Sequence, residues 1–338
     1  MHVTFPGQMR QDEVWDGFFE RHYNGPRRGL AKRIFANAGV VTRHGAVNPL
    51  VEDASGWSTA KRMSRYLTEA LPLGKDAVGG ALSAAGLRPD QVGLFVVCSC
   101  TGYATPGLDI LLARDLGMAP DTQRLFIGHM GCYAALPGLG AASDFVVSRG
   151  RPAVLLCLEL TSLHVQPPTD DPQQIVAHSL FSDAAAAVVL VPGGAGAGVS
   201  DIVAVTDTAT ADHMTWDVTD LGFRMGLSPK VPDVLSIYVA DLVTRLIEPH
   251  GLTPAEVDGW AVHPGGPRIL DVVRDRLELP EAALAESRDT LAAHGNCSSP
   301  TVLLIIDALR RRAAGPPRTT VALAFGPGLT LYGVLLQL

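Results

Sequence analysis

The chain has 338 residues, of which 47% are hydrophobic and 18% charged, so it can bury a large core in one big or two fused domains. Its net charge of −7 argues against nucleic acid as the main partner, because phosphate binding needs a basic surface. The first residues lack the apolar run of a signal peptide, and no stretch is long enough to span a membrane. Five cysteines are too few for a disulfide framework, so we expect a cytoplasmic protein without a membrane partner.

The first local feature is the basic segment PRRGLAKR, which contains Arg27, Arg28, Lys32 and Arg33. On charge alone, a solvated helix face explains it best, and a site for an anionic ligand is the alternative.

The sequence also repeats itself. Gly86–Cys98 and Gly251–His263 share the pattern Gly-Leu-x-Pro-x-x-Val followed by an apolar run. Gly131 and Gly295 are separated by the same number of residues, to within one, as the starts of these two segments. Each of the two glycines begins a run of small and apolar residues typical of a buried helix. In both halves a further apolar strand follows, AVLLCLEL in the first and TVALAF in the second.

This order of helices and strands predicts an internally duplicated α/β fold with five layers, α/β/α/β/α, and pseudo-twofold symmetry. The glycine-rich stretch Pro192–Val199 is the expected junction, although a hairpin loop is possible there. We therefore expect an N-terminal half, 1–193, and a C-terminal half, 194–338. The symmetry brings the N-termini of two central helices together, and with them Cys132 and Asn296.

Cys132 lies between the strand-like run RLFIGHMG and the helix-like run YAALPGLGAASDFVV. At such a strand-to-helix turn, the helix dipole is expected to lower the pKa of the thiol, and nearby N–H groups can receive an oxyanion. Taken alone, a buried structural cysteine is the commoner explanation.

His263 ends the strand DGWAVH before a Pro-Gly-Gly turn, at the edge of the sheet where ligands bind in open α/β folds. A capped surface histidine is an equal alternative. Asn296 precedes a helix, so capping is its ordinary role. The duplication favours a second role, that of an amide donor opposite Cys132.

A cysteine, a histidine and an asparagine fit two chemistries. In a papain-like hydrolase, the histidine draws the proton from the thiol and the asparagine orients the histidine. In a Claisen condensation, the thiolate takes an acyl group, and the histidine and asparagine bind the oxygen of a malonyl thioester as it loses carbon dioxide. Condensation requires that water be excluded, and the small-residue helices together with Phe181 and Phe223 favour it.

Four ordered segments carry a resemblance: GHMGCYAAL, WAVHPGGPRIL, HGNCSSPTVLLIIDAL and AFGPGLTLYG. They resemble, in order and spacing, those of the chalcone synthase-like (type III) polyketide synthases of actinobacterial type. The resemblance covers nearly the whole chain and implies the thiolase fold. It also implies an acyltransferase that uses an acyl-CoA starter and malonyl-CoA, without a metal or other cofactor, and forms a pyrone- or resorcinol/phenol-type product.

The resemblance assigns the catalytic roles to Cys132, His263 and Asn296. Phe181 and Phe223 match the two phenylalanines that guard the passage between the coenzyme A tunnel and the reaction cavity. The positions that match cavity-lining or coenzyme A-binding residues are more numerous. Matching the cavity lining are Cys100, Thr101, Thr161, Leu163, His164, Met214 and Ser298; matching the coenzyme A site are Arg33 and, nearby, Lys32 and Arg43.

Two further positions bear on the resemblance. Ala324 replaces the first glycine of the family's Gly-Phe-Gly-Pro-Gly loop, which is expected to tighten the loop without abolishing activity. Thr105 begins a segment that in the family crosses a dimer interface, so the resemblance implies a homodimer.

Other classes fit less well. A ketoacyl synthase III shares the triad, but its His-Gln-Ala-Asn segment is absent. A metal or redox site built on Cys98, Cys100 and Cys157 lacks a second Cys/His pair at zinc spacing. A cysteine hydrolase remains the alternative from another class.

Overall fold

The first sheet is built on two fully buried strands. Leu94–Cys98 (β4) and Ala153–Glu159 (β6) are parallel neighbours with every side chain buried, as expected of strands covered on both faces. The sheet order is β1-β7-β6-β4-β5, so β5 lies at one edge. The other three strands are β1 (His2–Thr4), β5 (Gln123–Ile127) and β7 (Ala184–Leu190).

The second sheet has the order β11-β12-β13-β8, and only its first pair, β11 with β12, is parallel. Its strands are β8 (Gly198–Thr206), β11 (Gly259–Val262), β12 (Thr319–Gly326) and β13 (Thr330–Gln337).

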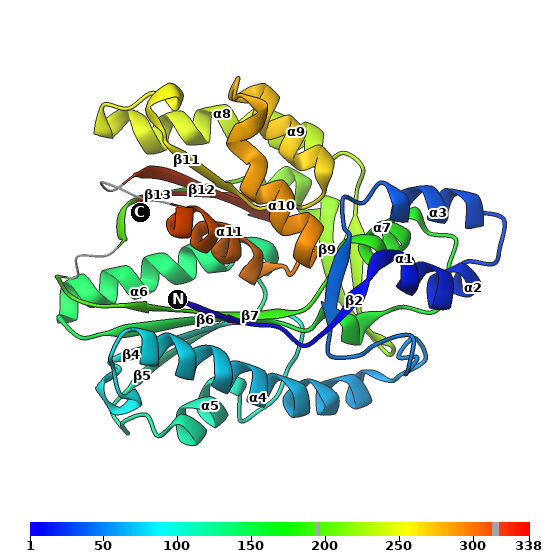
Figure 1. Ribbon diagram of the computed structural model, residues 1–338, viewed down its shortest axis with the longest axis horizontal. Helices are drawn as coiled ribbons and strands as arrows, with labels where there is room; N and C mark the ends of the chain where they lie inside the picture. Colours follow the sequence, from blue (N-terminus) through cyan, green and yellow to red (C-terminus); the bar gives the residue numbers. More distant parts are fainter. Residues whose placement is uncertain (194–196, 313–317) are drawn as a thin grey trace.

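Helices form three layers around these sheets (Figure 1). Two helices lie between the sheets, α6 (Ala135–Arg149) and α11 (Ser299–Arg312). The outer layer on the first sheet contains α4 (Thr59–Ala84) and α5 (Leu108–Leu116). The outer layer on the second sheet contains α8 (Val231–Ile247), α9 (Pro267–Arg276) and α10 (Ala285–His294).

The central helices pack closely because their sequences are small or apolar. A Cβ added at Gly138 of α6 would lie 2.9 Å from Leu155 Cδ1 and 3.0 Å from Cys98 Sγ, so only glycine allows this helix to approach the sheet so closely. The core between the sheets combines residues of both central helices and both sheets.

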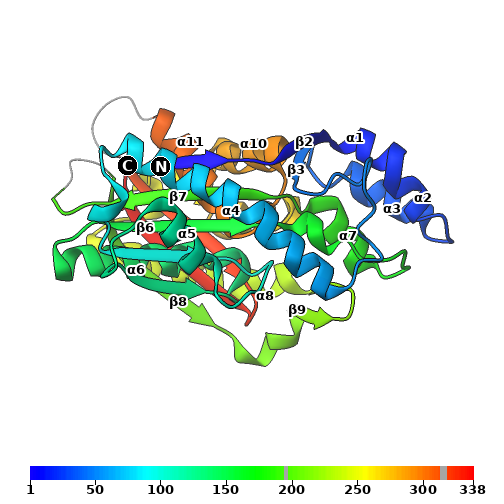
Figure 2. The ribbon, with the colours of Figure 1, turned by 90° about the horizontal axis from the view of Figure 1, so that it is seen from below.

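A smaller lobe lies at one end of the layers (Figures 1 and 2). It consists of helices α1 (Gln11–Val14), α2 (Glu20–His22), α3 (Arg28–Ala36) and α7 (Pro172–Leu180), with the strand pair β2 (Gly7–Arg10) and β3 (Thr42–Gly45). The hairpin of β9 (Met214–Thr219) and β10 (Gly222–Leu227) packs on α7.

The structure is a computed structural model that describes residues 1–193, 197–312 and 318–338. The layered, duplicated α/β architecture expected from the repeat is confirmed, because each half contributes a sheet and one of the two central helices. The expected junction falls partly on residues 194–196, which lie outside the described residues. Within the described ranges, no helix is both long and apolar enough to cross a membrane.

Candidate active site

Cys132 lies where the chain turns from strand β5 into central helix α6. A 3-10 turn, Gly131–Tyr133, precedes the helix, and Gly131 has a φ of +69°, in the left-handed region that favours glycine. The strand-to-helix turn expected from the sequence is therefore present. The Cys132 side chain is buried and lines a cavity of about 540 Å³.

The electrostatic expectation for Cys132 is wrong. The pKa of the thiol is raised to about 11, chiefly by burial; a hydrogen bond with Ser298 lowers it, and the nearby carboxyl of Glu159 adds to the increase. The helix dipole favours the thiolate, but desolvation of the buried thiol disfavours it more strongly, and burial cannot be read from the local sequence. A thiol with this pKa is neutral at neutral pH and needs a base to attack an acyl group.

His263 directly follows β11, and its imidazole is buried in the wall of the same cavity. Neither ring nitrogen has a hydrogen-bond partner among the described residues. Burial lowers the imidazole pKa to about 3, so the ring is neutral. A buried imidazole without partners requires an explanation, and a bound molecule in the cavity supplies one.

Asn296 connects α10 to α11 and also lines this cavity. Its backbone N–H donates to Leu180 O at 2.8 Å, and its backbone carbonyl accepts from Ser182 N at 2.9 Å. Its side-chain Oδ1 accepts from Ser298 N at 2.8 Å. The amide oxygen thus orders the turn into α11, a capping role, while Nδ2 has no hydrogen-bond partner among the described residues.

Phe181, at the end of α7, lines the 540 Å³ cavity and also a second cavity of about 30 Å³, and Cys132 lines both. This second cavity contains five of the sequence-predicted lining residues: Cys100, Thr101, Thr161, Met214 and Ser298. Phe181 thus lies in the wall of both cavities, a position compatible with the predicted gate.

Phe223 and His164 form a stacked pair behind this gate. Their ring centroids are 4.5 Å apart, with an interplanar angle of 10°. Phe223 N donates to His164 Nδ1 at 2.9 Å, so His164 Nε2 carries the proton and donates to Thr101 O at 2.7 Å. Both rings line a third cavity, of about 60 Å³, rather than the two that contain Cys132. Leu163, expected in the cavity wall, is buried in the core beneath α4.

The residues expected to bind coenzyme A lie at different places. Lys32 and Arg33 are exposed on α3, whose neighbouring residues Ile34 and Asn37 line the 540 Å³ cavity. Arg43 is buried and points its guanidinium at backbone carbonyls, so it is not a surface site for phosphates. Arg268, which sequence reasoning missed, lines the cavity where it reaches solvent, and its side chain is 70% exposed.

Trp216 was also missed by sequence reasoning. Its ring lines the 30 Å³ cavity, and its Nε1 donates to Cys100 O at 2.8 Å. Trp216 lies two residues after Met214 on β9, and alternate residues of a strand share a face. The strand period, applied to the Met214 assignment, would have identified it.

The carboxyl of Glu159 lies at the end of β6, behind the small cavity, and is completely buried. Its Oε2 accepts from Cys100 N at 3.0 Å and Thr101 Oγ1 at 2.8 Å, and its Oε1 accepts from Ser299 Oγ at 2.9 Å. Burial raises its pKa to about 7. Glu159 fixes the loop after β4 and the start of α11, on both sides of Cys132.

Comparisons with known proteins agree with this geometry. The family description "Chalcone and stilbene synthases" matches residues 42–195 with its N-terminal domain and residues 200–338 with its C-terminal domain. A 1,3,6,8-tetrahydroxynaphthalene synthase of Streptomyces peucetius is 38% identical over 93% of this chain and 85% of its own length. The alpha-pyrone synthesis polyketide synthase-like Pks18 of Mycobacterium tuberculosis is 31% identical over 98% of this chain and 88% of its own.

Solved structures show the same likeness. The 1,3,6,8-tetrahydroxynaphthalene synthase of Streptomyces coelicolor, a bacterial type III polyketide synthase, superposes with a TM-score of 0.93 at 29% identity, covering 99% of this chain and 97% of that one. A polyketide synthase of the brown alga Ectocarpus siliculosus gives 0.92 at 27% identity, covering 99% and 96%. The chain therefore belongs to the chalcone and stilbene synthase family and is a type III polyketide synthase.

Proposed function

We propose that this enzyme loads an acyl group from an acyl-CoA starter onto Cys132 and extends it with malonyl-CoA by decarboxylative Claisen condensation. The observation that carries the proposal is that Cys132, His263, Asn296 and Phe181 all line one cavity of about 540 Å³. A cavity of this size accommodates the reacting end of a thioester.

In the loading step, the Cys132 sulfur attacks the thioester carbonyl and coenzyme A leaves as a thiol. The neutral imidazole of His263 accepts the thiol proton and returns it to the leaving sulfur. The proton moves as the bond between sulfur and the carbonyl carbon forms, because burial disfavours both a free Cys132 thiolate and a free His263 imidazolium.

In the extension step, the His263 ring N–H and Asn296 Nδ2 donate hydrogen bonds to the thioester oxygen of malonyl-CoA. The negative charge that develops on this oxygen as carbon dioxide leaves is stabilised by these donors. The resulting enolate carbon attacks the acyl carbonyl on Cys132, the sulfur leaves, and the chain, two carbons longer, is transferred to coenzyme A. No metal or other cofactor is needed for these steps.

The small inner cavity favours a small starter, such as malonyl or another short acyl group. It measures about 30 Å³, and Trp216, Met214 and Phe181 fill the space around it. A long acyl chain would have to displace these side chains, at the cost of their packing. We propose that the extended chain cyclises to a phenol- or pyrone-type product, the two product types named for the relatives.

We also propose that coenzyme A enters past α3 and α9, with Arg33, Lys32 and Arg268 facing its phosphates. These three cations lie on the two helices at either side of the cavity. Arginine and lysine side chains are the usual partners of phosphate groups.

A homodimer is proposed from the edge of the first sheet. Among the strands that the structure describes, β5 pairs with β4 alone, and its residues Leu125 and Phe126 are each 39% exposed. An edge strand with exposed apolar residues is a template for pairing with another chain. Thr105 and the exposed Tyr103 belong to the loop between β4 and α5.

The test is to offer the purified protein malonyl-CoA with a panel of acyl-CoA starters, and to measure carbon dioxide release and cyclised products by mass spectrometry. We expect release with malonyl-CoA and short starters. Cys132→Ala should remove acyl loading while part of the malonyl-CoA decarboxylation persists, because that step uses His263 and Asn296. If no starter supports decarboxylation, the proposal is wrong; if loading survives in Cys132→Ala, the nucleophile is misassigned.

A further inference from the structure

Two arginine residues, Arg43 and Arg62, are buried. Among the described residues, neither forms an ion pair with a carboxylate. Their guanidinium groups bind backbone carbonyls instead. Burying a cation costs free energy, so a buried arginine needs hydrogen-bond acceptors around it. The carbonyls that each arginine binds therefore identify the segment that it stabilises.

Arg43, on β3, binds the end of helix α7. Its Nη1 donates to His178 O at 2.7 Å and to Phe181 O at 3.4 Å, and its Nη2 donates to Ser179 O at 2.6 Å. Burial lowers the pKa of the guanidinium only to about 10, so it remains charged at neutral pH. A cation at this place also interacts favourably with the negative end of the helix.

Within residues 178–181, the carbonyl of Leu180 is the one that Arg43 does not bind, and it accepts a hydrogen bond from the catalytic asparagine, Asn296. Leu180 O accepts from Asn296 N at 2.8 Å, and Ser182 N donates to Asn296 O at 2.9 Å. The segment 178–183 therefore carries the gate residue Phe181 and at the same time fixes the backbone of Asn296. Any shift of this segment moves both.

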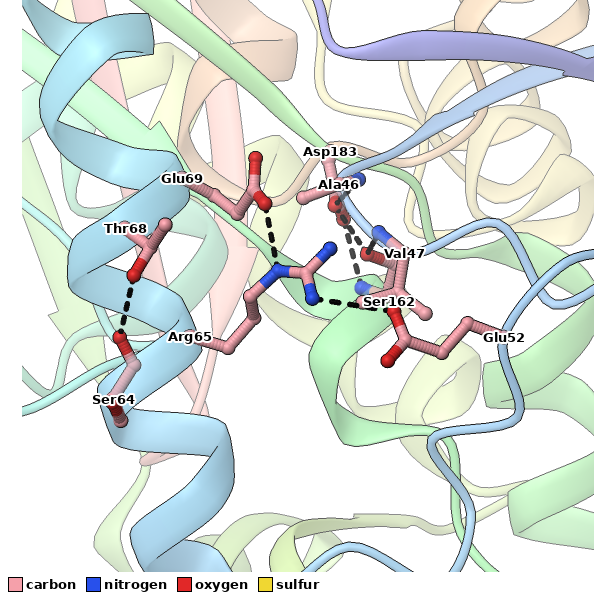
Figure 3. Close-up of polar contacts among 9 residues, drawn as sticks. All are labelled: Ala46, Val47, Glu52, Ser64, Arg65, Thr68, Glu69, Ser162 and Asp183. Atoms are coloured by element: carbon pink, nitrogen blue, oxygen red, sulfur yellow. Dashed lines mark hydrogen bonds and ion pairs between the residues drawn. The ribbon is translucent and has the colours of Figure 1, made fainter.

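Neighbouring residues of β3 and the loop after it hold the other end of the segment. Asp183 accepts from Ala46 N at 2.8 Å and from Ser162 N at 2.8 Å, contacts that Figure 3 shows, and Asp183 N donates to His44 O at 3.0 Å. Residues 43 to 46 thus bind the segment at both ends, and Arg43 supplies the only charged group among these donors.

We propose that Arg43 is a positioning residue that sets Asn296 and Phe181 for malonyl decarboxylation. This inference rests on the proposed function above. Arg43 lines neither of the two cavities that contain Cys132. It lies in the wall of the 60 Å³ cavity together with Phe181, and its Nη donors bind the backbone of the segment 178–183, so we infer that it acts through that segment.

Arg62 is the matched control. It is also buried, but it donates to Trp57 O at 2.9 Å, Ser55 O at 3.1 Å, Val165 O at 3.1 Å and Leu163 O. None of these carbonyls belongs to the segment that pairs with Asn296. Replacing Arg62 tests the general effect of removing a buried guanidinium from this protein.

The experiment compares Arg43→Lys and Arg43→Gln with Arg62→Lys and Arg62→Gln. For each, kcat for malonyl-CoA decarboxylation and the rate of acyl loading on Cys132 are measured, the second by mass spectrometry of the acyl-enzyme. We expect the Arg43 variants to lose about tenfold to a hundredfold in decarboxylation kcat, because misplacement by about 1 Å has effects of this size, with loading changed less than about threefold. The Arg62 variants should leave the ratio of the two rates unchanged.

The outcomes separate the two proposals. Folded Arg43 variants with an unchanged ratio, or Arg62 variants that shift it equally, overturn the role of Arg43. A wild-type protein that does not decarboxylate malonyl-CoA overturns the proposed function itself. If neither Arg43 variant folds, Gln11→Leu replaces them, because Gln11 Nε2 donates to Ser179 O at 2.9 Å; it should shift the ratio in the same direction, and an unchanged ratio overturns the inference.

Discussion

Glu159 makes the stability of this protein depend on pH in a direction opposite to that of most carboxyl groups. Its side chain is completely buried and accepts four hydrogen bonds, one of them from the Cys100 thiol, yet burial outweighs them and raises its pKa from an ordinary value of 4.5 to about 7. The folded protein therefore keeps a proton on Glu159 at a pH where the unfolded chain has released it. Raising the pH then favours the unfolded chain.

The magnitude follows from the shift. Each pKa unit corresponds to about 1.4 kcal/mol, so ionising Glu159 in the folded protein costs about 3 kcal/mol of unfolding free energy. This stabilising contribution is complete below the unfolded pKa of 4.5 and is lost as the pH rises to about 7. By linkage, the loss is about 1 kcal/mol at pH 5 and about 3 kcal/mol at pH 8.

Glu159→Gln removes the titration and keeps the shape. The amide oxygen can accept from Cys100 N and Thr101 Oγ1, and the amide nitrogen can donate to Ser299 Oγ. Urea unfolding of the wild type and the variant at pH 5 and pH 8 gives the difference in unfolding free energy at each pH. We expect this difference to move by about 2 kcal/mol in favour of the variant between pH 5 and pH 8. Buried histidines titrate equally in both proteins and cancel; a difference that is the same at both pH values refutes the reasoning.

Three further predictions concern the site and its surface. Alkylation of Cys132 by iodoacetamide should accelerate about tenfold per pH unit from pH 7 towards pH 10, because burial keeps its pKa near 11; a plateau by pH 8, measured by mass spectrometry, contradicts this. Trp216→Ala should enlarge the 30 Å³ cavity and shift kcat/KM towards longer acyl-CoA starters, whereas Trp216→Phe should shift it less; an unchanged preference contradicts the role of the ring. Phe126→Arg should convert a dimer to monomers in light scattering, while Ile237→Arg, on outer helix α8, should not; a dimer that persists in Phe126→Arg excludes the β5 edge as the interface.

The fold can be predicted from the sequence because short local patterns reveal the internal duplication. The shared Gly-Leu-x-Pro pattern and the two glycine-led helices indicate equivalent positions in the two halves, and equivalent positions lie together around a pseudo-twofold axis. That geometry brings Cys132 and Asn296 to one cavity without any knowledge of side-chain contacts. The strand-end position of His263 follows from the Pro-Gly-Gly turn after it.

The properties that the sequence did not predict depend on distant segments. The raised pKa of Cys132 comes from burial, to which Ser298, Glu159 and the cavity walls all contribute from other parts of the chain. The environment of Arg43 is equally non-local: its partners lie more than a hundred residues away, so its basic side chain looks like part of a surface patch. Local patterns describe elements, and desolvation is a property of the assembled core.

Burial alone does not distinguish a group that binds substrate from one that holds the scaffold, but the partners of its polar atoms do. His263 is buried with both ring nitrogens unpaired among the described residues, so its hydrogen-bonding capacity is reserved for a molecule that enters the cavity. In Asn296, the amide Oδ1 accepts a hydrogen bond from Ser298 N, and Nδ2 has no partner among the described residues and can donate to a substrate. Arg43 gives both Nη groups to the backbone and leaves only its Nε without a partner among the described residues, so most of its hydrogen-bonding capacity holds the segment it binds. His263 and Asn296 are thus placed to contact the substrate directly, whereas Arg43 acts through the backbone. Substituting either of the first two should remove a group that takes part in the reaction, and substituting Arg43 should displace such groups.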